Sequence, residues 1–148
     1  MKVPEIEIVS WGDSFATGIR LVDEQHKELI KLTNELYRAC LIGVEETGPV
    51  FKEALSCTVE YVRFHFAAEL EILEKVNYPD YNEHKKQHEF LIKHILAASK
   101  EFGSGKKFIP NQFVRTLKDW VFGHIAFYDK QFAAYIADQK SKGLLDDL

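Results

Sequence analysis

The chain has 148 residues, of which 46% are hydrophobic, 13% aromatic and 28% charged, and its formal net charge is −4. A chain of this length forms one domain by default and can bury a core without disulfide or zinc staples. The acidic balance argues against a nucleic-acid-binding protein, because phosphate contacts require a clustered basic surface. No apolar run approaches the roughly 20 residues of a bilayer span, and the acidic N-terminal segment does not fit a signal peptide. We therefore expect a cytoplasmic protein without membrane insertion.

Glycine and proline residues divide the chain into an N-terminal arm, over residues 1–20, and four helical stretches. The first helix is expected to begin at Asp23, a favourable N-cap residue, and to stop before Gly43. The second is expected to open at Pro49, because proline suits the first turn of a helix. Apolar residues recur every three or four positions within the stretches, as in amphipathic helices. The expected helices span residues 23–41, 49–76, 81–102 and 111–139.

Four amphipathic helices with short connections predict an all-α fold, an up-down-up-down antiparallel four-helix bundle with an extended N-terminal arm. We expect a single domain over residues 1–148, with the bundle over about residues 21–139 and a frayed tail over 140–148. The two cysteines, Cys40 and Cys57, are too few for a disulfide framework or a thiolate metal site.

Five of the six histidines occur together with acidic residues at helical spacing. A separation of four residues, as in His84 and His88, puts two side chains on one face of a helix. The remaining histidine, His94, lies roughly 80° from the face of His84 and is interpreted as a surface residue. The candidate metal ligands are, in chain order, His26, His65, Glu69, His84, His88, His124 and Asp129.

All seven candidates are expected at one end of the bundle. In an antiparallel bundle the beginnings of the first and third helices share an end with the C-terminal parts of the second and fourth, where the candidates lie. His124 and Asp129 are five positions apart, which is about 140° on an ideal helix. Asp129 therefore reaches the site only if the fourth helix is locally overwound or bulged, a distortion often found at functional sites.

A single histidine of this kind is more often a packed or surface residue than a ligand. The joint pattern favours a metal, because burying five imidazoles and two carboxylates without one would be costly. The set is too large for one tetrahedral zinc, and imidazole with carboxylate suits iron, copper or zinc. Two octahedral irons that share two carboxylates and a solvent oxygen fit the set and leave one coordination position open.

The candidate ligands and the segments around them closely resemble the hemerythrin family, in particular its bacterial members. The resemblance extends from about Trp11 to Tyr135. Leu70 departs from it, because many bacterial members have a second glutamate at this position. The segments that carry the resemblance include Asp23-Glu24-Gln25-His26-Lys27, His65-Phe66, Tyr78-Pro79, His84-x-x-x-His88 and Trp120-x-x-x-His124-Ile125.

The resemblance assigns a role to each candidate ligand. It implies two non-haem iron ions, one held by three histidines (His84, His88 and His124) and the other by two (His26 and His65). Glu69, Asp129 and an oxo or hydroxo group would bridge the two irons. The residues that resemble the apolar oxygen pocket of the family are Phe66, Trp120, Val121 and Ile125.

The resemblance implies reversible dioxygen binding, for oxygen carriage, storage or delivery, with no catalytic residues and no enzymatic activity. The first alternative is an oxygen or redox sensor, which usually needs a second domain and would here need a signalling partner. The second is a di-iron oxidase or an enzyme that consumes peroxide or nitric oxide. Such sites typically use four glutamates and two Glu-x-x-His motifs, and this sequence has none of these motifs. We expect a monomer whose partner is dioxygen and an oxygen-consuming enzyme or a signalling protein.

Overall fold

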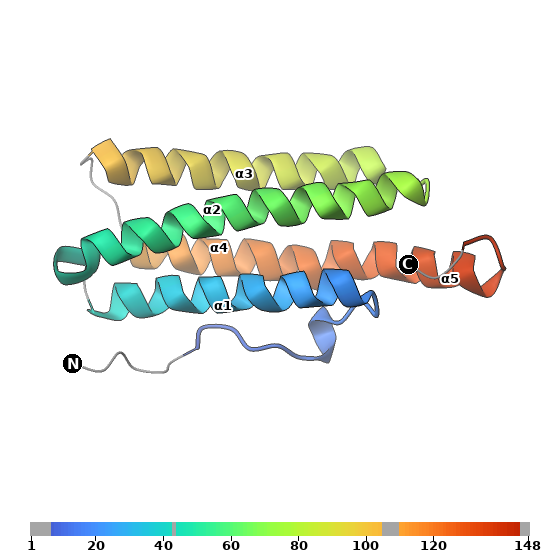
Figure 1. Cartoon of the computed structure of the whole chain (residues 1–148), viewed down its shortest axis with the longest axis horizontal. Coiled ribbons are helices and arrows are strands. Elements are labelled where there is room, and N and C mark those ends of the chain that lie inside the picture. The colour runs from blue at the N-terminus through green and yellow to red at the C-terminus, as the bar shows by residue number, and fades with distance from the viewer. Residues whose placement is uncertain (1–6, 43, 105–109, 146–148) are drawn as a thin grey trace.

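The structure, a computed structural model, describes residues 7–42, 44–104 and 110–145 (Figure 1). Within these ranges all regular structure is helical, and α4, η2 and α5 follow one another as the fourth rod of the bundle. The predicted all-α fold is therefore confirmed. The elements are η1 (Asp13–Phe15), α1 (Arg20–Ile42), α2 (Val44–Lys75), α3 (Tyr81–Ser104), α4 (Pro110–His124), η2 (Ile125–Asp129) and α5 (Lys130–Ser141).

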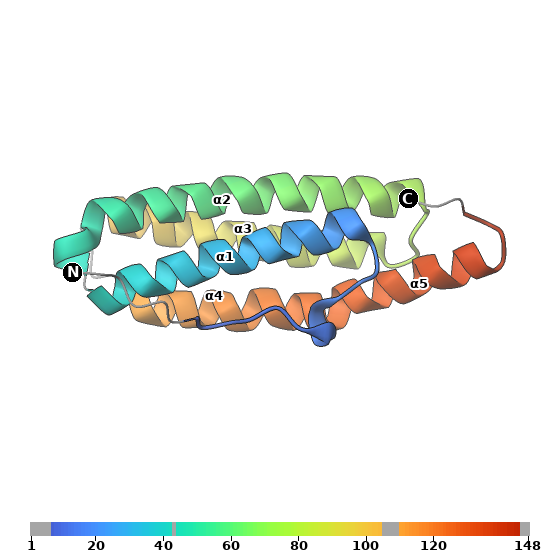
Figure 2. The same cartoon turned by 60° about the horizontal axis from the view of Figure 1, so that its bottom comes forward.

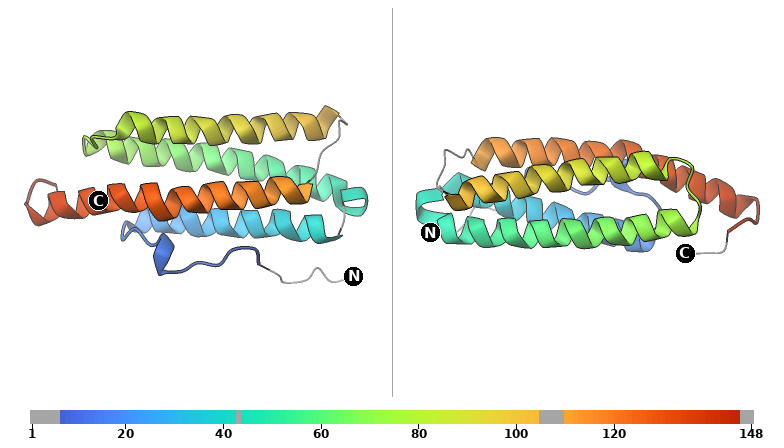
Figure 3. Two further views of the ribbon diagram at one scale, coloured as in Figure 1. Left: turned by 180° about the vertical axis from the view of Figure 1, so that it is seen from behind. Right: turned by 90° about the horizontal axis from the view of Figure 1, so that it is seen from above.

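The four rods run alternately up and down, as predicted, and each packs against two neighbours. Helix α1 contacts α2 and α4, and α3 contacts the same two helices from the other side. Figures 2 and 3 show the resulting four-cornered bundle, in which α5 continues the line of α4 beyond the end of α2. The N-terminal arm runs along the outside of α1 (Figure 1), and η1 contacts η2.

Two helices begin earlier than the sequence predicts. Helix α1 begins at Arg20, and the carboxylate of Asp23 accepts hydrogen bonds from Thr17 N (2.8 Å), Thr17 Oγ1 (2.7 Å) and Gly18 N (3.2 Å). Asp23 therefore fixes the start of the helix from inside its first turn. Helix α2 begins at Val44, so Pro49 lies in its second turn. Proline at such a position removes one backbone hydrogen bond.

The core consists of two separate apolar clusters. Along the chain, the histidine- and carboxylate-bearing turns fall between them in every rod, so a buried polar layer divides the core. The larger cluster is built from residues such as Leu36, Phe51, Leu55, Leu91 and Leu117. The smaller cluster comprises Ile19, Val22, Leu73, Val76, Tyr78, Phe132 and Ile136.

The N-terminal arm is attached to the bundle through one buried side chain. Asn34, which is 3% exposed, accepts hydrogen bonds from Ile8 N (2.9 Å) and Val9 N (3.2 Å) and donates one to Val9 O (2.9 Å). Farther along the arm, Phe15 packs on Phe122 with ring centroids 5.5 Å apart. The arm thus covers one side of the bundle as an ordered element.

Two further expectations concern the membrane and the chain ends. Across the described ranges, every helix is too short or too polar to cross a bilayer. Helix α5 ends at Ser141, and Leu145 contacts the smaller apolar cluster. The expectations for residues 1–6 of the arm and 146–148 of the tail lie outside the described residues.

Candidate metal centre

The structure brings all seven predicted ligands together. They lie on α1, α2, α3, α4 and η2, and each is at most 5% exposed. A buried layer of five imidazoles and two carboxylates is unusual in a bundle core, because charged and polar side chains are rarely buried without partners. The convergence that the helix topology predicts is therefore present. The assignment of each residue as a ligand remains a prediction.

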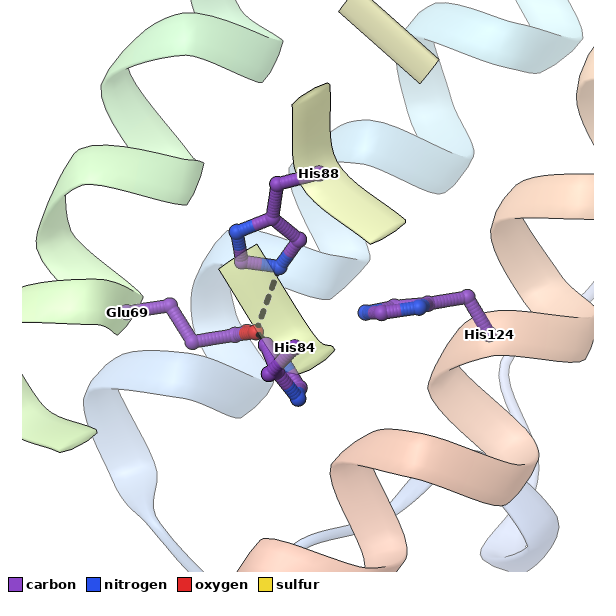
Figure 4. Close-up of side chains that lie close together, drawn as sticks. All are labelled: Glu69, His84, His88 and His124. Atoms are coloured by element: carbon purple, nitrogen blue, oxygen red, sulfur yellow. Dashed lines mark hydrogen bonds and ion pairs between the residues drawn. The ribbon is translucent and has the colours of Figure 1, made fainter. Parts of the chain in front are cut away.

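Glu69 lies at the centre of this layer and contacts four of the histidines. Its Oε1 is 2.5 Å from His84 Nε2 and 3.0 Å from His88 Nε2. Its Oε2 is 3.3 Å from His65 Nε2 and 3.6 Å from His26 Nε2. Figure 4 shows the α3 histidines directed at the Glu69 carboxylate, with His124 reaching toward them from the fourth rod. One carboxylate thus has one oxygen facing each half of the site.

Asp129 has a similar position, and the local helix geometry explains how it reaches the site. Its Oδ1 is 3.2 Å from both His84 Nε2 and His124 Nε2, and its Oδ2 is 3.1 Å from His26 Nε2. Residues 125–129 form a π-helix, in which hydrogen bonds join residues five apart. Asp129 consequently lies one turn beyond His124 despite the five-residue spacing. The predicted bulge in the fourth helix is confirmed.

The ligand atoms fall into two overlapping groups that could each hold a metal ion. In each group the donor atoms lie within 4.8 Å of one another. Glu69 belongs to both groups, as expected for a bridging carboxylate. Asp129 belongs only to the group of His26 and His65, but it also contacts His84 and His124 of the other group. The first group is Glu69, His84, His88 and His124, and the second is His26, His65, Glu69 and Asp129.

The hydrogen-bonding pattern fits a metal better than a purely structural polar cluster. Within the described ranges, no hydrogen bond of acceptable geometry reaches Oε2 of Glu69 or either carboxylate oxygen of Asp129. The same is true of both ring nitrogens of His26 and of Nδ1 of His88. Leaving a buried polar group unsatisfied costs about 1–3 kcal/mol, and more for a charged group. Metal coordination would use the oxygen lone pairs and one nitrogen lone pair of each imidazole.

In the metal-free protein the site balances its charge with protons. Burial lowers the pKa of His26, but Asp129 and Glu69 outweigh this effect and raise that pKa to about 9. His84 has a pKa of about 9 for the same reasons. Burial would raise the pKa of Glu69, but His26, His65, His84 and His88 hold it well below its usual range. With these raised pKa values, His26 and His84 are imidazolium groups at pH 7, and their charges face the two carboxylates of the metal-free site.

Asp129 and His88 shift for different reasons. Burial and the charge of Glu69 would raise the pKa of Asp129, but His124 and His26 outweigh them and lower it. The pKa of His88 is lowered, first by burial and then by the charges of His84 and His124, which exceed the opposing effect of Glu69. His88 therefore offers a neutral imidazole without first losing a proton.

Sequence reasoning missed Gln25 as a member of the site. This α1 residue is 6% exposed, and its Oε1 lies 2.7 Å from His65 Nδ1. An amide oxygen can only accept here, so Nδ1 of His65 donates to Gln25, and Nε2, which faces Glu69, is the ring atom that would bind a metal. The only signal in the sequence is the position of Gln25 directly before His26. Helix periodicity does not reveal which turn of α1 faces His65.

The predicted apolar pocket is described in part. Phe66 is 4% exposed and stacks parallel to the His88 ring, with centroids 3.7 Å apart and an interplanar angle of 4°. Ile125 is 2% exposed. Trp120 and Val121 lie on α4, but their side chains are outside the described part of the structure. His94 is exposed, as predicted, and stacks on Phe113 away from the other histidines.

Comparison with known proteins gives one consistent family. The model of the hemerythrin HHE cation-binding domain matches residues 17–136. A bacteriohemerythrin from Stenotrophomonas maltophilia is 30% identical over 126 residues, covering 85% of this chain and 80% of the relative. One from Methylococcus capsulatus is 27% identical over 126 residues, covering 84% and 94%. The crystal structure of a wild-type hemerythrin superimposes with a TM-score of 0.79 at 26% identity, covering 86% of this chain and 96% of that one.

Proposed function

The chain belongs to the hemerythrin family, and from this premise we propose that it binds dioxygen reversibly at a non-haem di-iron centre. Two ferrous ions would supply the electrons and the coordination position that reversible oxygen binding needs. The observation that carries the proposal is the sharing of Glu69 between two groups of histidines, three on one side and two on the other.

We assign the residues as follows. Three histidines would hold one iron and two would hold the second, and Glu69 and Asp129, with an oxo or hydroxo group, would be shared by both. The shared position of Glu69 and the contacts of Asp129 with histidines from both groups support this assignment. The histidines of the first iron are His84, His88 and His124, and those of the second are His26 and His65.

The surroundings of the site favour carriage over catalysis. A set of five imidazoles and only two carboxylates provides little anionic charge, whereas catalytic bundle sites usually carry four glutamates. The Phe66 ring and Ile125 are buried and apolar, and a dry surrounding limits proton and water access that would release bound oxygen in a reduced form. We propose that Trp120 and Val121 complete this pocket. Membership of a cation-binding family also favours a binding protein over an enzyme.

The test is a visible absorption spectrum of anaerobically Fe(II)-loaded protein, exposed to oxygen and then purged, with iron per chain assayed on the same sample. We expect two irons and a band that appears with oxygen and vanishes on purging. His65→Ala should abolish the band and leave the helical content unchanged, whereas His94→Ala, at the exposed histidine, should leave both unchanged. Irreversible oxidation by oxygen would favour the sensor or oxidase alternative, and one metal or none would contradict the di-iron assignment.

We further propose that residues 1–148 act as a single cytoplasmic, monomeric domain that delivers oxygen to an oxygen-consuming enzyme. The family match over residues 17–136 supports one domain for the central part of the chain. Sedimentation of the loaded protein would test the monomer. A stable dimer at micromolar concentration would contradict it.

A further inference from the structure

A pocket of about 210 Å³ opens beside the candidate metal centre. It lies where the first turn of α3 faces η2 and the beginning of α5. The outer wall is formed by exposed residues together with the half-buried Tyr128, and the inner wall by Tyr78 and His84, which are 8% and 2% exposed. The pocket is lined by Tyr78, Asp80, Glu83, His84, Tyr128 and Gln131.

His84 connects this pocket to the bridging carboxylates. Its Nε2 lies 2.5 Å from Glu69 Oε1 and 3.2 Å from Asp129 Oδ1. All seven candidate ligands are at most 5% exposed, so a metal ion needs a route through the packed bundle to reach them. In the described part of the chain, the pocket places solvent against one ligand at the edge of the smaller apolar cluster, where Tyr78 forms part of its wall.

The chemistry of the pocket wall suits a hydrated cation. Its two charged residues apart from His84, Asp80 and Glu83, are both acidic and exposed. Within the described ranges neither is paired with a lysine or arginine, and the Asp80 carboxylate accepts no hydrogen bond.

The size of the pocket is also compatible with an ion that keeps its water. At about 30 Å³ per water, six waters occupy roughly 180 Å³, which is less than the pocket volume of about 210 Å³. A cleft lined by one sign of charge raises the local concentration of the opposite ion and its rate of arrival.

We propose that this pocket is the uptake route through which divalent iron reaches the site, with Asp80 and Glu83 attracting the hydrated ion and His84 receiving it first, once His84 has given up its proton to solvent. This inference rests on the metal centre of the proposed function but not on oxygen binding. The pocket is an access route, so its carboxylates affect how fast the site fills and leave unchanged how much metal it finally holds.

The test measures the rate and the endpoint of metal uptake separately. Metal-free protein is mixed anaerobically with Fe(II), and free Fe(II) is trapped by a coloured chelator at successive times. The variant is Asp80→Asn with Glu83→Gln. Asparagine is chosen at position 80 because it is as good an N-cap residue as aspartate. The control is Glu35→Gln with Glu53→Gln, which removes the same charge from exposed positions in the halves of α1 and α2 farther from the histidines.

We expect the pocket variant to fill about tenfold more slowly at low ionic strength and to reach the same iron content as the wild type. The difference should narrow at about 0.15 M salt, where exposed charges are screened beyond about 8 Å. Gln131→Arg, which places a positive charge in the pocket without touching either carboxylate, should slow uptake as well. The control pair should load at the wild-type rate.

Three results would overturn the proposal. Wild-type loading rates in the pocket variant would mean that iron enters elsewhere, and equal slowing in the control would mean that only overall charge matters. A lower final iron content with unchanged fold would make the two carboxylates ligands instead of uptake residues. A wild-type chain that binds two irons but does not bind oxygen reversibly would contradict the proposed function and leave the uptake route intact, because the rates are read without oxygen.

Discussion

The hydrogen bond from His65 to Gln25 offers the sharpest test of how this chain prepares its metal site. We predict that Gln25→Leu weakens metal binding on the side of His65 and leaves the other side unchanged. Gln25 is 6% exposed and His65 is 1% exposed, so water cannot replace the lost acceptor. The Nδ1–H group of His65 would then be buried without a partner.

The expected magnitude follows from two effects. A buried donor without a partner costs about 1–3 kcal/mol, so the metal-free variant should unfold at lower denaturant by that amount. Without its acceptor, the imidazole of His65 can also turn or carry its proton on Nε2, the atom that faces Glu69 at 3.3 Å. Loss of such a partner to a ligating histidine typically lowers metal affinity by about 10- to 100-fold, which is about 1.4–2.7 kcal/mol.

The assay is an anaerobic titration of metal-free protein with Fe(II), in which two binding steps are resolved. In Gln25→Leu one step should weaken by the stated factor and the other should stay at the wild-type value. Gln25→Glu keeps an acceptor at the same position and should bind both ions at least as tightly. Thr33→Val removes another buried polar group from α1, one that donates only to Leu29 O at 2.8 Å, and should leave both steps unchanged. Two wild-type affinities in Gln25→Leu would refute the reasoning.

Four further predictions follow, two on pH, one on the arm and one on the apolar pocket. Metal loading at pH 7 should release at least two protons per chain, because His26 and His84 have pKa values raised from 6.5 to about 9 and must be neutral to bind, and forming a hydroxo or oxo bridge from water would add to this number. Calorimetry in buffers of different ionisation enthalpy counts the protons, and zero release would contradict these protonation states. The same two shifts stabilise the metal-free fold below about pH 6.5, and this contribution is lost as the pH rises through about 9, so the Tm of the metal-free protein should fall over that interval. Asn34→Ala removes three hydrogen bonds to the arm and should lower the free energy of unfolding by about 2–4 kcal/mol. Proteolysis of the arm should also become faster. Glu35→Gln, at the exposed neighbouring position, should change neither quantity. Phe66→Leu keeps an apolar side chain but removes the ring stacked on His88. It should lower the free energy of unfolding by about 1 kcal/mol and shorten the lifetime of the oxygen-bound form. A wild-type lifetime would contradict a role for this ring in the pocket.

The sequence is sufficient to predict the bundle and the convergence of the histidines, because both follow from helix periodicity and antiparallel topology. It is insufficient to predict contacts that depend on how one helix is rotated against another. Gln25 is the clearest case, since its partner lies forty residues away on α2. The uptake pocket is a second case, because it joins the start of α3 to η2 and α5, and no local pattern connects these segments.

The π-helix likewise leaves no signal in the apolar pattern of the fourth rod. The buried Val114 and the buried Phe132 lie eighteen positions apart, which is five turns of a regular α-helix. The apolar register therefore does not reveal the extra residue. Only the five-residue spacing of His124 and Asp129, once both are taken as ligands, predicts the π-bulge.

The extra residue in η2 also has a consequence for how this chain can change during evolution. Deleting any one residue between 125 and 128 would reduce the spacing from His124 to the aspartate to four, which is one turn of a regular α-helix. The carboxylate would still face the metal site, and Phe132 and Ile136 would still face the core. The bundle therefore does not depend on the bulge, and a single deletion is the mutation by which a lineage would lose it while keeping both the fold and the ligand set.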